Sequence, residues 1–482
     1  MDELADAIQN RFGKIGGFGD IRVHTGISFC HGHSMEKSAG NFNADCILFL
    51  LPVLSYIAAN NLRRMRCDLK FPENFLWGTA TSPTQIEGYV VNEWTDYIAS
   101  DGGNCRIACN HYHLYEQDIG LMAGLGVNAY RMGIEWSRLQ SAPFAALNQK
   151  ELDRYIHLLD CLKAVNITPM VVLHHFSNPP WLTASGGWLN PATIPAFVDY
   201  ATKIVAALKD RVCLWNTFNE PDTYASLTYL LGGFPPFQKW KLGSYRKVIK
   251  NMAQAHVGAS EAIRRECCGG TKPEIGIAKN WTFFQAFQFY AFWDHVLAEI
   301  SHHSFNRFVL NEFVGGKRRD ASTFLGLNYY GRARLRHFQA LVPTNGVSDE
   351  RLKELGIVCD DMFERHPTGF GKLLRKLHRH CNLPIYITEH GSASADEDFR
   401  IRDLMGHLYE LHSAMNHGVD VRGFFYWSLL DNFEWQFGYT KKFGLFSVDF
   451  NDEQLPRKTT RVAQFYQEIC RAARPHQRVN GA

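Results

Sequence analysis

The sequence has no large excess of charge of either sign and no long hydrophobic run. Its 51 basic and 48 acidic side chains leave a net charge of +3, which is too weak a field to attract nucleic acid or an anionic lipid surface. An apolar stretch over 47–59 is interrupted by Pro52 and falls short of the roughly 18 to 20 residues that a membrane-spanning helix needs. We therefore expect no nucleic-acid partner and no membrane partner, and a neutral ligand suits the chain better.

The sequence also lacks the motifs of several enzyme classes, because it has no nucleotide-binding glycine fingerprint and no nucleophilic serine elbow. Cys105 and Cys109, near His111 and His113, could be read as metal ligands, but no second cysteine pair follows at zinc-site spacing. The twelve cysteines are dispersed along the chain, which favours a reduced, cytoplasmic setting. We expect neither a cofactor nor a metal.

Residues 1–64 differ in composition from everything that follows. Residues 1–43 are rich in Gly, His, Ser and Asn without a helical or strand period, and the apolar stretch over 47–59 comes next. We interpret 1–64 as a poorly structured N-terminal extension. It is either a leader or membrane-associating segment, or a non-native segment if translation begins at Met65. The expected organisation is this extension, one domain over 65–475 and a C-terminal tail over 476–482.

From Phe75 onward, short β-rich runs alternate with longer stretches of helical periodicity, as in βαβ units around a parallel sheet. The helical stretches include 116–124, 149–165, 195–210 and 404–417. The β-rich runs lie at 75–80, 129–136, 168–176, 213–220, 273–280, 324–330, 383–390 and 421–429. A TIM barrel has eight parallel strands, and the sequence has eight such runs. We therefore predict an α/β protein with a single (β/α)8 TIM barrel.

Two of these runs end near a glutamate, Glu220 and Glu389, and the carboxyl ends of parallel barrel strands meet at one face. Cleavage of a glycosidic bond needs one carboxyl group to protonate the leaving oxygen and one carboxylate to stabilise or trap the anomeric carbon. Arg131 and Tyr330 could hold Glu389 ionised, and Asn219 could bind a sugar hydroxyl. Either glutamate alone could be a rim residue in an ion pair, but the combination favours glycoside chemistry.

The motifs TFNEP at 217–221 and ITEHG at 387–391 resemble the two catalytic signatures of glycoside hydrolase family 1, the β-glucosidase family. Five further segments resemble other landmarks of that family in the same order. They are FLWGTATSPTQIEG at 75–88, YRMGIEWSR at 130–138, LHHFSNPPW at 173–181, GLNYYG at 326–331 and YWSLLDNFEWQFGYTKKFGL at 426–445. The resemblance extends from about Leu69 to Tyr466.

The resemblance implies a retaining exo-β-glycosidase for terminal β-D-glucosides, with Glu220 as general acid/base and Glu389 as nucleophile. It implies sugar contacts from Gln85, His174, Asn219, Glu434 and Trp435, a stacking floor at Trp427, and Asn328 and Tyr330 beside a nucleophile supported by Arg131 and Tyr330. Such a set offers amides and carboxylate to hydroxyls and an aromatic face to the ring. Relatives that take 6-phosphorylated sugars resemble one another in having small and basic residues in place of Glu434. The implied partner is therefore a non-phosphorylated β-glycoside or short oligosaccharide, and galactosides and fucosides stay open.

One residue departs from the family pattern, because His390 follows the nucleophile where the family usually has Asn. Either it alters the acceptor side or the pH optimum, or its imidazole replaces one amide hydrogen bond. Two other activities stay open: a transglycosidase with an alcohol or sugar acceptor, and a catalytically silent sugar-binding protein on the same barrel. Silent relatives typically lack one catalytic glutamate, whereas this chain has both. The sequence does not predict the oligomeric state.

Overall fold

A computed structural model of the chain describes residues 69–336, 339–341, 352 and 357–472. The chain divides into two units, Met1–Asn61 and Leu62–Ala482, and every described residue belongs to the second. The predicted extension over 1–64 and the predicted tail over 476–482 lie outside the described residues.

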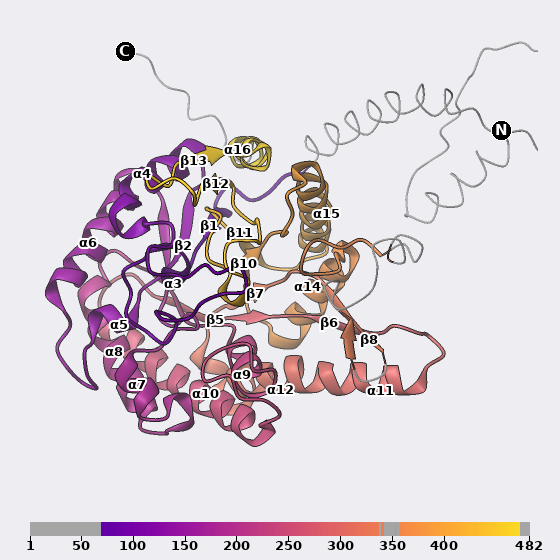
Figure 1. Cartoon of the computed structure of the whole chain (residues 1–482), viewed down its shortest axis with the longest axis horizontal. Coiled ribbons are helices and arrows are strands. Elements are labelled where there is room, and N and C mark those ends of the chain that lie inside the picture. Colours follow the sequence, from indigo (N-terminus) through magenta and orange to yellow (C-terminus); the bar gives the residue numbers. More distant parts are fainter. Residues whose placement is uncertain (1–68, 337–338, 342–351, 353–356, 473–482) are drawn as a thin grey trace, which may run out of the picture. The chain divides into compact units, whose positions relative to one another are not determined.

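Eight parallel strands close into a barrel in the spatial order β1-β11-β10-β7-β5-β4-β3-β2 (Figure 1). Each strand lies inside one of the eight runs named above, so the predicted (β/α)8 barrel is confirmed. The barrel strands are β1 (Leu76–Ala80), β2 (Ala129–Gly133), β3 (Thr168–Val172), β4 (Leu214–Asn219), β5 (Glu274–Asn280), β7 (Leu325–Asn328), β10 (Ile385–His390) and β11 (Val421–Trp427).

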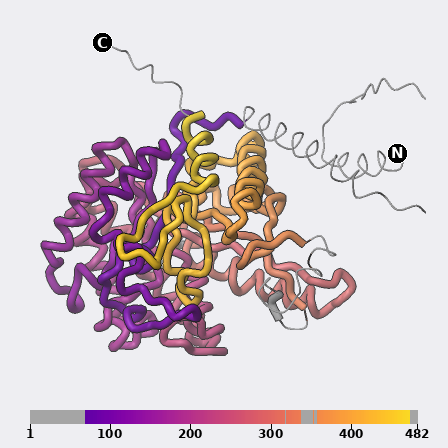
Figure 2. Tube along the Cα trace, turned by 45° about the horizontal axis from the view of Figure 1, so that its top comes forward, coloured from indigo at the N-terminus to yellow at the C-terminus, as the bar shows by residue number. Residues whose placement is uncertain are grey.

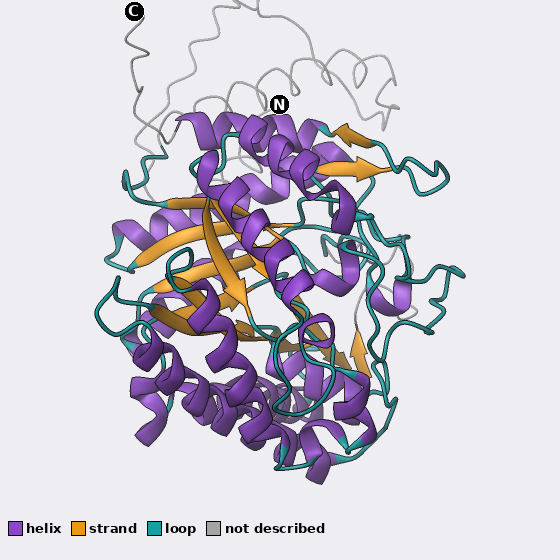
Figure 3. Cartoon of the chain, turned by 90° about the vertical axis from the view of Figure 1, so that its left-hand side faces the viewer, coloured by secondary structure: helices purple, strands orange, loops and turns teal. Residues whose placement is uncertain are grey.

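Helices cover the outside of the barrel (Figure 3). The longer ones are α4 (His111–Leu125), α6 (Gln149–Ala164), α8 (Thr193–Leu208), α9 (Pro221–Tyr229), α10 (Leu242–Glu266), α11 (Phe292–Ser301), α14 (Pro367–Cys381), α15 (Glu397–Asn416) and α16 (Arg461–Ala472). Shorter ones include α3 (Pro83–Ile86), α5 (Trp136–Leu139), α7 (Pro180–Ala184), the π-helix η2 (His302–Arg307) and α12 (Phe308–Val314). The four predicted helical stretches fall on α4, α6, α8 and α15.

The start of α15 shows how a local signal sets a helix boundary. The apolar period predicts a helix from about Leu404, but the helix begins at Glu397. Asp396 precedes it and accepts a hydrogen bond from the Phe399 amide at 3.0 Å, which satisfies one of the free amides of the first turn. The cap extends the helix by a polar N-terminal turn that apolar periodicity does not reveal.

The last helix of the described residues packs next to the start of the barrel. α16 packs on α15 and α4, and in Figure 2 its yellow tube runs beside the indigo start of the barrel. The Tyr466 hydroxyl donates to the Gly78 carbonyl at 2.8 Å, so the last helix contacts the first strand directly.

Short strands outside the barrel form two further sheets. β6 (Phe283–Ala286), β8 (Arg332–Arg336) and β9 (Gln339–Leu341) make one, and β12 (Phe446–Val448) and β13 (Arg457–Thr459) make the other. Across the described ranges, no helix is long and apolar enough to cross a membrane.

Candidate active site

Glu220 follows directly after β4, where the chain turns into α9. Its backbone is in the left-handed region, with φ of 39°, and the helix begins at Pro221. Proline at the first helical position has no amide hydrogen to leave unbonded, so the helix can start at once. Asn328 Nδ2 donates to Glu220 Oε1 at 2.7 Å and Asn280 Nδ2 donates to Oε2 at 3.3 Å. Both donors are neutral amides.

Glu389 lies on β10, one residue before the strand ends, and it contacts a cation. Arg131 Nη1, from β2, donates to Glu389 Oε1 at 2.6 Å, and the Tyr330 hydroxyl donates to Oε2 at 2.8 Å. The Arg131 side chain is fully buried, so no water competes for this bond. A charge-assisted bond of this kind favours the ionised carboxylate. The two glutamates therefore lie in different electrostatic surroundings.

A network of amides connects the two glutamates. Asn219 Oδ1 accepts from Arg131 Nη2 at 2.6 Å and from Asn328 Nδ2 at 3.1 Å. Asn328 also donates to Glu220, and Arg131 also donates to Glu389. All five side chains are at least 95% buried. Side chains from β2, β4, β7 and β10 thus fix the relative positions of the two carboxyl groups.

The protonation of the pair follows from these contacts. Burial raises the pKa of Glu220 to about 8, with further increases from the charges of Glu389 and Asp222. Burial also raises the pKa of Glu389, but Arg131 and Tyr330 oppose that rise. Two close carboxyl groups do not ionise together, and we assign the first ionisation to Glu389 because it contacts the guanidinium. The site then holds one carboxylic acid and one carboxylate near neutral pH.

Aromatic and amide side chains lie next to the two glutamates, and together with them they form the group that we call the pocket. Asn219 Nδ2 donates to His175 Nε2 at 3.0 Å, and the His175 ring stacks on Trp427 and Trp435, with ring centroids 5.9 and 6.4 Å away. Glu434 precedes Trp435, and burial, with the charge of Glu389, raises its pKa to about 8. His175 follows β3, Asn219 ends β4, Trp427 ends β11, and Glu434 and Trp435 lie in the segment after β11. The pocket therefore lies at the carboxyl ends of the strands.

Gln85 joins this group from α3. Its Nε2 donates to Glu434 Oε2 at 3.1 Å and to Asn432 Oδ1 at 3.0 Å, while its Oε1 accepts from the Ser82 hydroxyl at 2.6 Å. With every polar atom of the Gln85 side chain engaged, the amide has one orientation, and it holds Glu434 in place.

The prediction for His174 is corrected, because its side chain lies outside this pocket. Its Nε2 lies 3.1 Å from Asn178 Oδ1, and its ring packs edge-on against Trp188 and Tyr224. His174 and His175 are adjacent in the chain after β3, but their side chains contact different groups. The neighbouring His175 takes the position that was expected for His174.

His390 also lies outside the pocket. Its Nδ1–H donates to the Tyr329 carbonyl at 2.8 Å, and its ring lies against His407 with centroids 4.1 Å apart. Burial, with the charges of His407 and Arg365, holds the pKa of His390 well below its usual range. It is therefore a neutral imidazole that donates one hydrogen bond. This geometry favours the second of the two alternatives for His390.

The alternative metal ligands near residue 105 are engaged elsewhere. The Cys105 thiol donates to the Trp94 carbonyl at 3.4 Å, and the Cys109 thiol donates to the Asp431 carbonyl at 3.1 Å. His111 contacts Asp118 at 2.7 Å. Over the described residues, the groups with metal-ligand spacing are instead Glu116 with His157 and Cys161, and His390 with Asp403 and His407. Both carboxyl oxygens of this Asp403 already accept from Arg365.

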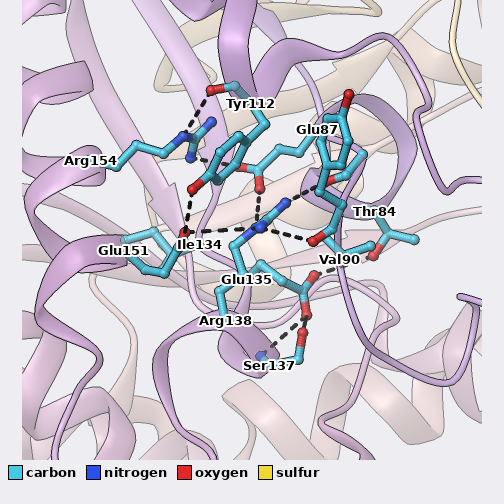
Figure 4. Close-up of polar contacts among 12 residues, drawn as sticks. Thr84, Glu87, Val90, Tyr112, Ile134, Glu135, Ser137, Arg138, Glu151 and Arg154 are labelled. Carbon is cyan, nitrogen blue, oxygen red and sulfur yellow. Dashed lines mark hydrogen bonds and ion pairs between the residues drawn. The ribbon is translucent and has the colours of Figure 1, made fainter.

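Glu87, from the same motif as Gln85, belongs to a separate buried cluster (Figure 4). Arg138 Nε donates to its Oε2 at 2.9 Å, and the Tyr155 hydroxyl donates to its Oε1 at 3.0 Å. Arg154 Nη1 lies 3.5 Å from the same oxygen. Burial alone would raise the pKa of Glu87, but Arg154 and Arg138 outweigh it and lower the pKa. The cluster joins α3 to α5 and α6.

Several residues of the site are absent from the sequence prediction. His175 could have been found by applying the alternation of side chains to the HH pair. Asn280 donates to Glu220, and the preceding Lys279 makes a buried ion pair with Asp222. A lysine inside an apolar strand run, immediately before an amide, is the signal that could have drawn attention to β5.

A closed parallel barrel that holds a carboxylic acid, a carboxylate and an aromatic, amide-lined pocket at its strand ends defines an O-glycosyl hydrolase. The sequence profile of glycosyl hydrolase family 1 matches residues 67–319 and 316–474. The chain belongs to this family, as the motifs indicated.

Known relatives agree with this assignment. Beta-glucosidase A of Thermotoga maritima is 32% identical over 432 residues, covering 80% of this chain and 94% of that protein. The solved β-glycosidase from Pyrococcus horikoshii is 34% identical, with a TM-score of 0.74 over 84% of this chain and 96% of the other. The β-glucosidase from Thermotoga maritima in complex with glucoimidazole is 28% identical, with a TM-score of 0.73 over 84% and 100% of the two chains. The protein is a β-glycoside hydrolase.

Proposed function

We propose that this hydrolase is a retaining exo-β-glycosidase for terminal, non-phosphorylated β-D-glucosides. The observation that supports it most is the contrast between the two carboxyl groups. Glu389 bonds to the buried guanidinium of Arg131, whereas Glu220 accepts from neutral amides. A retaining mechanism requires this combination of a carboxylate nucleophile and a carboxylic acid.

In the proposed reaction, Glu389 attacks the anomeric carbon while Glu220 protonates the leaving oxygen. The glycosidic bond breaks and an ester bond forms between the sugar and Glu389. Ester formation removes the negative charge of Glu389, so the pKa of Glu220 falls and its carboxylate can accept a proton from water. The water oxygen then attacks the anomeric carbon, and the β-configured sugar and free Glu389 are released.

The pocket chemistry supports a neutral sugar as substrate. Glu434 is held by Gln85 and can exchange hydrogen bonds with sugar hydroxyls, and it offers no positive charge to an anionic phosphate. Trp427 offers an aromatic face to the ring. The Thermotoga maritima β-glucosidase has been solved with glucoimidazole, deoxynojirimycin and castanospermine, and we expect such sugar-like ligands in this pocket. Galactosides and fucosides are alternative substrates, because a carboxylate accepts from either epimer of the 4-hydroxyl.

The cysteines support a reducing, cytoplasmic compartment. Cys105 and Cys109 are buried thiols with strongly raised pKa values. Burial is the main cause of both shifts, and it keeps these thiols from exchange with disulfides.

The test is hydrolysis of aryl β-D-glucosides, galactosides, fucosides and 6-phosphoglucosides by the wild type, Glu389→Ala and Glu274→Ala. Glu274 is the matched control, since it begins β5 at the opposite end of the barrel. We expect hydrolysis with retention by the wild type and control, and no turnover by Glu389→Ala until azide yields the α-glycosyl azide. Inversion, or an unaffected Glu389→Ala, would contradict the proposal.

Two outcomes would favour the alternatives left open by the sequence. Glycosides of an added alcohol as the main product would make the protein a transglycosidase with the same residues. Sugar binding without turnover of any glycoside would favour a silent binding protein. NMR of the reaction mixture distinguishes both from hydrolysis, because it identifies the product and its anomeric configuration together.

A further inference from the structure

Lys279 is a charged residue inside the barrel wall. It lies on β5, where its neighbours Ile277 and Ala278 are fully buried, and its own side chain is 1% exposed. Its Nζ donates to Asp222 Oδ2 at 2.5 Å and to the Asn280 carbonyl. Burying an ammonium group is costly unless a counter-ion and hydrogen bonds compensate for lost water. The other buried residues of this part of β5 are apolar, so the charged pair calls for a role.

The pair joins two segments that lie next to Glu220. Asp222 is two residues after Glu220, in the first turn of α9. Asn280 is the next residue after Lys279, and its Nδ2 donates to Glu220 Oε2 at 3.3 Å and to Thr223 Oγ1 at 3.0 Å. The ion pair therefore ties the helix that begins after Glu220 to the strand whose last residue contacts the Glu220 carboxyl group.

We propose that Lys279 and Asp222 are positioning residues for Glu220: their buried charge pair holds Asn280 against the carboxyl group and sets how readily Glu220 releases its proton. This inference rests on the proposed function, because it assumes that Glu220 is the acid/base. The role of the pair is to position Glu220 and to set its proton affinity, and it is separate from the roles of the two catalytic carboxyl groups.

Charged and polar groups from several elements surround Glu220 and Lys279. The groups that face Glu220 are Glu389 on β10, Asn328 on β7, Tyr330 after β7, Asn280 and Lys279 on β5, and Asp222 and Thr223 on α9. Those that face Lys279 are Asp222, the Asn280 carbonyl, Asn306 Oδ1 at 3.5 Å, His302 and the rings of Trp281 and Phe305. Burial is the largest cause of the raised pKa of Glu220, the charge of Glu389 is the next, and the charge of Asp222 follows. Burial lowers the pKa of Lys279, and the charges of Asp222 and Glu220 partly offset that decrease.

Removing one charge at a time should move the Glu220 pKa in opposite directions. In Asp222→Asn the anion is lost and the ammonium of Lys279 remains, so the Glu220 pKa falls by about one unit. In Lys279→Met the anion of Asp222 loses its counter-ion, so the Glu220 pKa rises by a similar amount. The double variant Asp222→Asn/Lys279→Met returns the pKa toward the wild-type value. A purely structural pair would not produce opposite signs.

The experiment measures the Glu220 pKa by ¹³C NMR of glutamate labelled at its carboxyl carbon, with the signal assigned by Glu220→Gln. The alkaline limb of kcat/KM is measured in parallel. Asp160→Asn and Arg211→Met are the matched controls, since they remove an exposed ion pair away from the pocket. Opposite shifts in the two single variants, and neither shift in the controls, support the proposal. Single variants that fold with an unchanged Glu220 pKa overturn it.

A separate variant covers the case in which removing a buried charge prevents folding. Asn280→Ala leaves the ion pair intact and removes the half-buried amide that donates to Glu220 and to Thr223. Because a donor to the ionised form is lost, we expect the Glu220 pKa to rise by less than one unit and kcat to fall at constant KM. No change in either value overturns the proposal. The NMR titration reads Glu220 whether or not the protein turns over, so failure of the proposed function is distinguishable from failure of this inference.

Discussion

Arg131 fixes Glu389 through one nitrogen while its other terminal nitrogen binds a second residue of the pocket. Nη1 donates to Glu389 Oε1 and Nη2 donates to Asn219 Oδ1, both at 2.6 Å. The guanidinium is planar, so the angle between its two donors is fixed. The position of the carboxylate is thereby coupled to the amide that also contacts Asn328 and His175.

Replacing this guanidinium should test the coupling directly. In Arg131→Lys a single ammonium cannot reach both acceptors in the same geometry, so we expect kcat to fall by about 100-fold. Because the hydrogen bond from the cation to Glu389 is weakened, the pKa of Glu389 rises, and the acid limb of the pH profile moves to higher pH. Arg138→Lys is the control, since this buried arginine contacts Glu87 outside the pocket. An Arg131→Lys enzyme with the wild-type kcat and acid limb would contradict the assignment.

The pH dependence of the rate should report the two glutamates. Activity needs Glu389 ionised and Glu220 protonated, so kcat/KM should be bell-shaped and fall above a pH of about 8, the pKa of Glu220. Glu220→Gln should remove the alkaline limb. With a dinitrophenyl glycoside, whose leaving group needs no proton, that variant should still form the glycosyl-enzyme at a measurable rate. A wild-type rate that is flat from pH 5 to pH 9 in a chemistry-limited assay is incompatible with these roles.

The two adjacent histidines should behave differently when replaced. His175→Phe keeps an aromatic ring against Trp427 but removes the acceptor for Asn219, so kcat/KM should fall by about 10-fold to 100-fold with little change in Tm. His174→Phe should lower Tm by a few degrees and leave KM unchanged, because it removes a buried hydrogen bond outside the pocket. Calorimetry and initial rates on both variants show which of the two histidines lies in the pocket. A larger change in KM for His174→Phe than for His175→Phe would assign the pocket position to His174.

The barrel could be predicted from the sequence because its signal is repeated. Eight apolar runs at intervals suited to helical crossovers leave few alternative folds, and each run contains its strand. The ends of helices are less predictable, since a cap such as Asp396 acts through one side chain rather than through a period.

The site could be predicted only in part, because a motif names residues without giving their directions. The carboxyl ends of the barrel strands meet at one face, and there the structure brings together Glu220, Glu389, Arg131 and Tyr330. The resemblance implies His174 as a sugar contact, because the motif does not tell which of the two adjacent histidine side chains lies in the pocket. The pair of Lys279 and Asp222 depends on contacts between segments that are distant in the chain. Such contacts are set by tertiary packing and leave no local pattern.

The cluster around Glu87 should govern stability rather than catalysis. In Glu87→Gln the guanidinium groups of Arg138 and Arg154 lose their buried counter-ion, so we expect a loss of about 3 kcal/mol in the free energy of unfolding. Because the folded pKa of Glu87 lies below its unfolded value, the stability it contributes is present above the unfolded pKa and is lost as pH falls through the folded one. The wild type and Glu87→Gln should therefore differ most near pH 7 and converge in acid, which urea unfolding at a series of pH values measures. Glu151→Gln, a partly exposed neighbour whose carboxylate accepts from Tyr112, should change stability far less. Equal losses in the two variants, or a difference that grows in acid, would show that the Glu87 charge does not hold these helices together.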